Sequence, residues 1–102
     1  MKMNSAQIEQ TLHKLNAQEF KAEAIPAGHP MMSQLERLFG DHTYFLDSNG
    51  LSIVEPLEPE NDARLGVVVN LACWADDRAE SLQPHAPETT ELVIDLRTDS
   101  RH

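Results

Sequence analysis

Histidine and cysteine are the side chains in this 102-residue sequence best suited to binding a metal ion or attacking a substrate. There are five histidines, none of them two, three or four residues from another, and a single cysteine, Cys73. Zinc sites use such close pairs, so the spacing predicts no metal site. A nucleophilic pair of Cys73 and His42 would need a partly exposed thiol in positive surroundings. Strand alternation predicts instead that Cys73 points inward as a small apolar residue.

Carboxylates gather in the segment 75–88, which we expect to be a connection of about fourteen residues. Long connections in a compact domain are often functional. A small molecule could bind between this connection and the sheet, or a modest enzyme could have its site there. The residues that would form such a site, or meet a partner, are Asp76, Asp77, Glu80 and His85. The same carboxylates could hold a divalent cation, but clustered loop carboxylates are usually only solvated, and we expect no bound ion.

Other motifs that carry chemistry are absent from the sequence. It contains no glycine-rich phosphate loop and no Gly-x-Ser-x-Gly turn. Asp47-Ser48-Asn49-Gly50 lacks the earlier carboxylates of a calcium loop, and a hairpin turn accounts for it. We therefore predict a non-enzymatic protein without a cofactor.

The chain is acidic. Eight lysines and arginines stand against seventeen aspartates and glutamates, which gives a net charge of −9. A nucleic acid backbone repels such a chain, and no basic stripe offsets the repulsion, so nucleic acid is excluded as a partner. The charge serves solubility, and it would also suit a basic protein partner, including the target of an inhibitor or immunity-type protein.

The sequence also does not indicate a protein of a membrane or of an oxidising compartment. The first residues are polar beyond Met3 and do not form a signal peptide. The sequence has no run of the about 18 apolar residues that a membrane span needs. With one unpaired cysteine, these features predict a cytoplasmic protein.

Two helices and five strands must position these residues. Asn4 with Gln7 predicts a capping box for a helix that ends near Asn16, and Pro30 and Gly40 bound a second helix. Segment 20–25 alternates like an edge strand, with a continuing helix as the alternative. Asn49-Gly50 predicts a hairpin turn within 43–55, and 64–74 and 91–96 read as further strands.

The order is therefore α-β-α-β-β-β-β within a single domain, 1–97, followed by a tail, 98–102. We predict an α+β fold, a two-layer sandwich in which two helices cover one face of a mainly antiparallel sheet of four to five strands. The strand at 64–74, apolar on nearly both sides, is expected in the middle of the sheet.

Two helices on one face would leave the other face open and apolar. The residues expected on that open face are Phe45, Val54, Val68, Trp74 and Val93. Soluble monomers seldom expose such a patch, so we predict a homodimer through it. The alternative is that the first helix, or the segment 75–88, folds over this face.

The sequence thus favours a non-enzymatic protein-interaction module, with acidic segments 55–62 and 75–88 facing a partner. A small-molecule-binding domain or modest enzyme with a site at 75–88 is the alternative from a different class.

Overall fold

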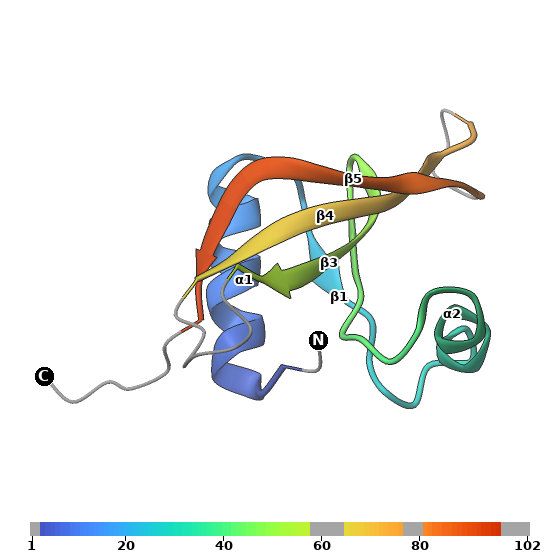
Figure 1. Cartoon of the computed structure of the whole chain (residues 1–102), viewed down its shortest axis with the longest axis horizontal. Helices are drawn as coiled ribbons and strands as arrows, with labels where there is room; N and C mark the ends of the chain where they lie inside the picture. Colours follow the sequence, from blue (N-terminus) through green and yellow to red (C-terminus); the bar gives the residue numbers. More distant parts are fainter. Residues whose placement is uncertain (1–2, 58–64, 77–80, 97–102) are drawn as a thin grey trace, which may run out of the picture.

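The computed structural model describes residues 3–57, 65–76 and 81–96 (Figure 1). The two helices and five strands follow the predicted order, and the strands form one antiparallel sheet in the order β1-β2-β3-β4-β5. The predicted α+β class is thereby confirmed. The elements are α1 (Ser5–Ala17), β1 (Glu23–Ala24), α2 (Met32–Phe39), β2 (Phe45–Asp47), β3 (Gly50–Pro56), β4 (Leu65–Trp74) and β5 (Leu82–Asp95).

The N-terminus of α1 has the predicted capping box. The Asn4 side chain accepts a hydrogen bond from the Gln7 N–H at 2.8 Å, and the Gln7 side chain accepts one from the Asn4 N–H at 3.0 Å. Gln7 also donates to the Leu96 carbonyl at 3.1 Å, which ties the start of α1 to the end of β5. Capping therefore fixes both the first residue of the helix and its place on the sheet.

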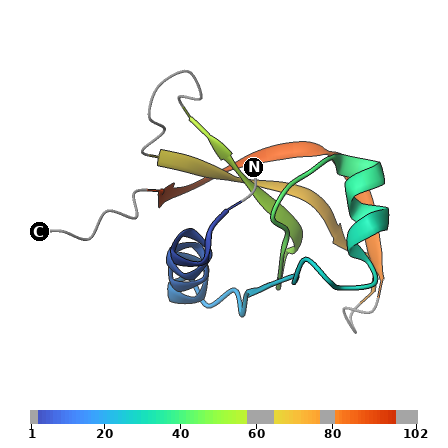
Figure 2. The ribbon, with the colours of Figure 1, turned by 90° about the horizontal axis from the view of Figure 1, so that it is seen from below.

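The two helices pack on opposite faces of the sheet, toward opposite ends of the strands (Figures 1 and 2). Leu15 of α1 packs in a cluster with Phe45, Val54 and Val68. Leu35 of α2 packs in a second cluster, with strand residues whose side chains point to the other face of the sheet. The expected placement of both helices on one face is wrong. β1 is a two-residue strand at the edge of the sheet. The chain passes around this edge, from α1 on one face to α2 on the other.

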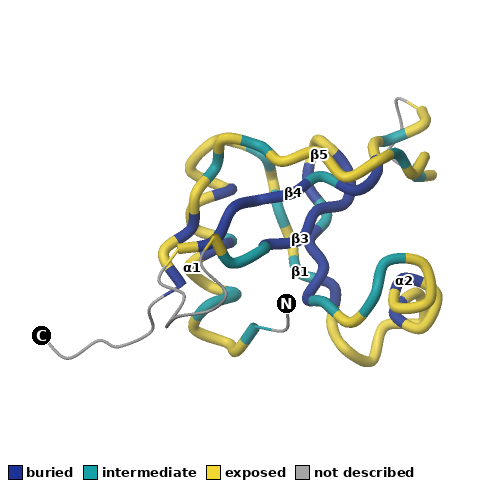
Figure 3. The backbone as a smooth tube through the Cα atoms, viewed as in Figure 1, coloured by how far each residue is buried: buried dark blue, intermediate teal, exposed yellow. Residues whose placement is uncertain are grey.

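The buried residues concentrate on β3 and β4, as expected for central strands (Figure 3). Segment 20–25 contributes only the short strand β1, and no helix continues through it. The predicted tail, 98–102, lies outside the described residues.

The hairpin between β2 and β3 forms, but its turn begins one residue earlier than predicted. Asp47 pairs with Gly50 and Leu46 with Leu51, so Ser48 and Asn49 are the turn residues. The Asp47 carboxylate accepts a hydrogen bond from the Asn49 N–H at 2.8 Å, which favours a turn that starts at the aspartate. Gly50 has a φ of +120° and follows the turn.

A β-bulge in β4 reverses the alternation of its side chains. Ser52 pairs with Asn70 and Leu51 with Ala72, which leaves Leu71 as an extra residue. Beyond the bulge, Ala72 and Trp74 face α2, and Cys73 is exposed. The predicted inward position of Cys73 is therefore wrong, because one inserted residue exchanges the two faces of a strand.

Much of the expected connection 75–88 is strand. β5 begins at Leu82, opposite Trp74, and continues to Asp95 with two irregularities in its pairing to β4. Pro84 and Pro87 lie within β5, which is possible because an outer strand tolerates residues that lack an N–H.

Candidate functional site

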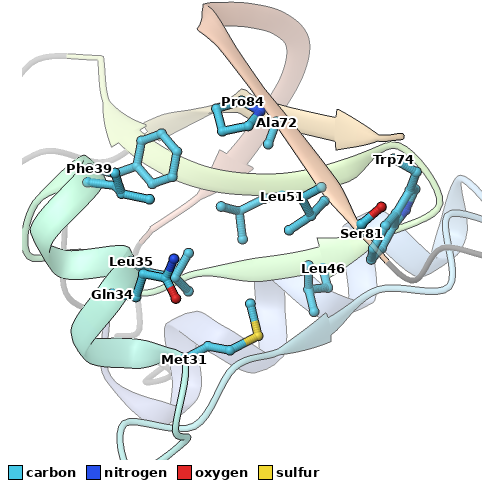
Figure 4. A pocket seen from close by; sticks show the side chains of 12 residues that line it. Met31, Gln34, Leu35, Phe39, Leu46, Leu51, Ala72, Trp74, Ser81 and Pro84 are labelled. Atoms are coloured by element: carbon cyan, nitrogen blue, oxygen red, sulfur yellow. The ribbon is translucent and has the colours of Figure 1, made fainter. Parts of the chain in front are cut away.

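A groove with a volume of about 580 Å³ lies between α2 and the strands (Figure 4). Among the described residues that line it, none is charged, although a quarter of the chain's residues are charged. Gln34 and Ser81 are its polar side chains. The groove is lined by Met31, Gln34, Leu35, Leu38, Phe39, Leu46, Leu51, Ala72, Trp74, Ser81, Leu82 and Pro84.

Tyr44 holds the α2 wall in place. Its hydroxyl lies 2.5 Å from the Gly40 carbonyl and 3.1 Å from the Leu35 carbonyl, so one hydroxyl serves two carbonyls at the end of α2. Its ring contacts that of Phe39, with the centroids 6.4 Å apart. Burial, and then the nearby carboxylates of Glu36 and Asp41, raise the pKa of Tyr44 to about 12. Tyr44 therefore stays a neutral donor to the helix end.

The floor of the groove depends on the bulge at Leu71. Without the extra residue, strand alternation would turn Ala72 and Trp74 to the α1 face. With it, Ala72 lies against Leu51 beneath the groove, and Trp74 stands opposite Leu82 at one end. The irregularity in β4 thus builds the site.

The indole of Trp74 is held by its ring nitrogen. Nε1 donates a hydrogen bond to the main-chain oxygen of Asp47 at 2.8 Å, which joins β4 to the β2–β3 hairpin. Trp74 also lines a smaller hollow of about 380 Å³ on its other side, together with Lys21, Glu23 and Ser48. The indole is therefore a fixed partition between two hollows.

Asp47 lines the smaller hollow too, and its carboxyl is largely buried. Burial raises the pKa of Asp47, against the lowering effect of hydrogen bonds from the Asn49 and Gly50 N–H groups. On the groove side of Trp74, the Ser81 hydroxyl donates to the Asp76 carboxylate at 3.2 Å.

His85, expected in a ligand-binding connection, lies on β5 and links three strands. Nε2 is 2.6 Å from Asn70 Oδ1, and Nδ1 is 2.7 Å from the Ala86 carbonyl. The Asn70 amide nitrogen in turn donates to the Leu51 carbonyl at 3.2 Å. These hydrogen bonds hold β3, β4 and β5 together beside the groove. His85 itself does not line the groove.

Of the other residues expected at 75–88, Asp76 is exposed next to the groove, whereas Asp77 and Glu80 lie outside the described residues. Among the described residues, no group of three or more metal-binding side chains occurs. The helices in the described ranges are all too short or too polar to cross a membrane.

The residues expected at a dimer interface are not together on an open face. Phe45, Val54 and Val68 are 0%, 1% and 3% exposed, because α1 covers them. Trp74 is half-buried on the opposite face, and Val93 remains exposed. The structure agrees with the alternative prediction, in which the first helix covers this face.

The groove residues on α2 were not predicted from the sequence. Helical spacing puts Met31, Leu35 and Leu38 on one stripe of α2, yet Leu35 is buried while Met31 and Leu38 are 38% and 60% exposed. The sequence did contain a signal for these residues, because α2 has more apolar residues than its packing against the core requires. Exposed apolar residues that border a hollow indicate a binding surface.

Comparison with known proteins gives no family for the chain: no family model matches it, and no curated protein or solved structure matches it significantly.

Proposed function

We propose that this chain is a non-enzymatic domain that binds a small apolar molecule in the groove between α2 and the sheet. The observation that carries the proposal is the uncharged lining of that groove in a chain with a net charge of −9. Small-molecule sites are typically mostly apolar hollows of about 300–1,000 Å³ with a few placed polar groups. The groove, with its about 580 Å³, Gln34 and Ser81, fits that description.

Trp74 provides the assay, because it lines the groove and is the chain's only tryptophan. We expect decyl maltoside, an uncharged amphiphile, to change its fluorescence in a saturable way below the concentration at which micelles form. Leu38→Glu places a carboxylate at the groove on a residue that is 60% exposed, so the core is unaffected. This variant should bind at least about ten-fold more weakly, equivalent to about 1.4 kcal/mol.

Leu57→Glu is the matched control, since Leu57 is 48% exposed and does not line the groove. Its affinity should equal that of the original protein. No saturable change in fluorescence, or equal weakening by both substitutions, would contradict the proposal.

Binding of a basic protein partner is a second candidate, supported by the net charge of −9. Phe45, Val54 and Val68 are not available for homodimerisation, because α1 already covers those side chains.

A further inference from the structure

Trp74 and Ser81 line one end of the groove, and each side chain has one proton that it can donate in a hydrogen bond (Figure 4). The two residues are neighbours, because the Ala75 N–H donates to the Ser81 carbonyl at 2.9 Å, just after the end of β4. The indole proton is already engaged by the Asp47 main-chain oxygen, with a donor–acceptor distance of 2.8 Å. Trp74 therefore offers a ligand its ring but no hydrogen-bond donor.

The hydroxyl proton of Ser81 is engaged as well. The Ser81 oxygen lies 3.2 Å from the Asp76 carboxylate, and a carboxylate can only accept, so the serine donates. A serine oxygen whose proton is engaged still has its lone pairs. A hydrogen bond to an anion also polarises the hydroxyl and makes its oxygen a stronger acceptor. Toward the groove, Ser81 therefore accepts a hydrogen bond but does not donate one while its bond to Asp76 is kept.

The rest of the lining adds a second requirement, that the ligand is neutral. None of the described residues that line the groove is charged, so an ionised group buried there would lose its hydration without gaining an oppositely charged partner. The Gln34 amide, the other polar side chain of the lining, can both donate and accept and does not discriminate between ligands. The discrimination between neutral ligands therefore depends on Ser81.

We infer that the ligand is a neutral alcohol: its apolar chain lies in the groove, and its hydroxyl group donates a hydrogen bond to Ser81 Oγ beside Trp74. The inference rests on the proposed function, since it names the chemical class of ligand for the same groove. The oxygen of a ketone or an ether can only accept, and it would face a serine oxygen whose proton is already engaged. An alcohol forms a hydrogen bond there that a ketone or an ether cannot form.

Three ligands with the same number of carbon atoms and a single oxygen test the inference: n-octanol, hexyl methyl ketone and heptyl methyl ether. Each is titrated below its solubility limit, with the fluorescence of Trp74 as the readout. The quantities compared are the ratio of alcohol to ether affinity and the ratio of ketone to alcohol affinity. When these ratios are compared between variants, the difference in hydrophobicity between the ligands cancels.

Two substitutions should change these ratios in different ways. Ser81→Ala removes the acceptor, so the alcohol-to-ether ratio should fall about three-fold, as expected for the loss of one hydrogen bond. Asp76→Ala releases the Ser81 proton, which can then be donated to a ketone oxygen, so the ketone-to-alcohol ratio should rise about two-fold. Ser33→Ala is the matched control, because Ser33 is an exposed serine of α2 that does not line the groove. It should leave both ratios unchanged. Ether affinity should be the same in the Ser81→Ala variant as in the original protein, which also shows that the variant is folded.

The outcomes distinguish the two proposals. If neither decyl maltoside nor any of the three ligands binds, the proposed function fails. If decyl maltoside binds and n-octanol does not, or if Ser81→Ala leaves the alcohol-to-ether ratio unchanged, the groove still binds apolar molecules and the inference of an alcohol is overturned. It is also overturned if Asp76→Ala does not raise the ketone-to-alcohol ratio, or if Ser33→Ala lowers the alcohol-to-ether ratio as much as Ser81→Ala does.

Discussion

Trp74 and Asp47 are joined by a 2.8 Å hydrogen bond from the indole nitrogen to the main-chain oxygen, across 27 residues of sequence. The bond connects the last residue of β4 to the end of β2, and thereby closes one end of the groove. The bulge at Leu71 makes it possible, because the extra residue turns Trp74 toward this face.

Trp74→Phe keeps an aromatic ring and removes the donor. The Asp47 main-chain oxygen then loses its bond from the indole, and we expect the free energy of unfolding to fall by about 1 kcal/mol. Urea unfolding followed by circular dichroism measures the change. An unaltered midpoint and slope would show that the bond contributes nothing to stability.

Tyr44→Phe tests the anchor of α2. The pKa of Tyr44 is raised to about 12 in the folded protein, whereas an ordinary tyrosine titrates near 10. The folded state thus holds the proton more tightly, so this group's contribution to stability is complete below pH about 10 and is lost as the pH rises to about 12.

In the Phe variant that loss between pH 10 and 12 should be absent, and stability at pH 7 should be lower by about 1 kcal/mol. Parallel alkaline titrations of stability in the two proteins measure the difference. Identical pH profiles would contradict the role given to the hydroxyl.

Gly50→Ala should be strongly destabilising. A Cβ at Gly50 would overlap the Ala72 carbonyl and lie 2.8 Å from the Cys73 Cα, and the φ of +120° disfavours any other residue. We expect a loss of at least about 2 kcal/mol in thermal or urea unfolding. Gly28→Ala is the control, because a Cβ there meets nothing within 4 Å, and its stability should remain within about 0.5 kcal/mol.

Cys73 reports on the bulge in β4. Since its thiol is exposed, a thiol reagent should modify it fully in the native protein, at a rate close to that in denaturant. Cys73→Ser should change stability by less than about 0.5 kcal/mol. Modification that requires unfolding would instead place Cys73 inside the protein and contradict the bulge at Leu71.

The features predicted well from the sequence depend on neighbours in the chain. The capping box of Asn4 and Gln7, the β2–β3 hairpin near Asn49-Gly50 and the apolar run of β4 are local patterns, and each forms the expected element. Local hydrogen bonds and turn chemistry act over a few residues, so the sequence alone is enough to find them.

The features predicted wrongly depend on contacts between distant residues. The extra residue Leu71 becomes visible only once β4 is aligned with β3, and its position decides where Cys73 and Trp74 point. The face chosen by α1 follows from its packing against Phe45 and Val54, far along the chain. The groove depends on both the bulge in β4 and the faces on which the helices pack. Its lining residues could therefore not be predicted from patterns in the sequence.

The proposed occupant of the groove between α2 and the sheet is an apolar ligand. The most direct measurement is a methyl NMR titration of the original protein with decyl maltoside. We predict saturable shifts confined to groove methyls such as those of Met31, Leu46 and Leu82, with Leu15 and Ile94 on the α1 face unchanged. Shifts spread equally over both faces, or none at all, would contradict the claim.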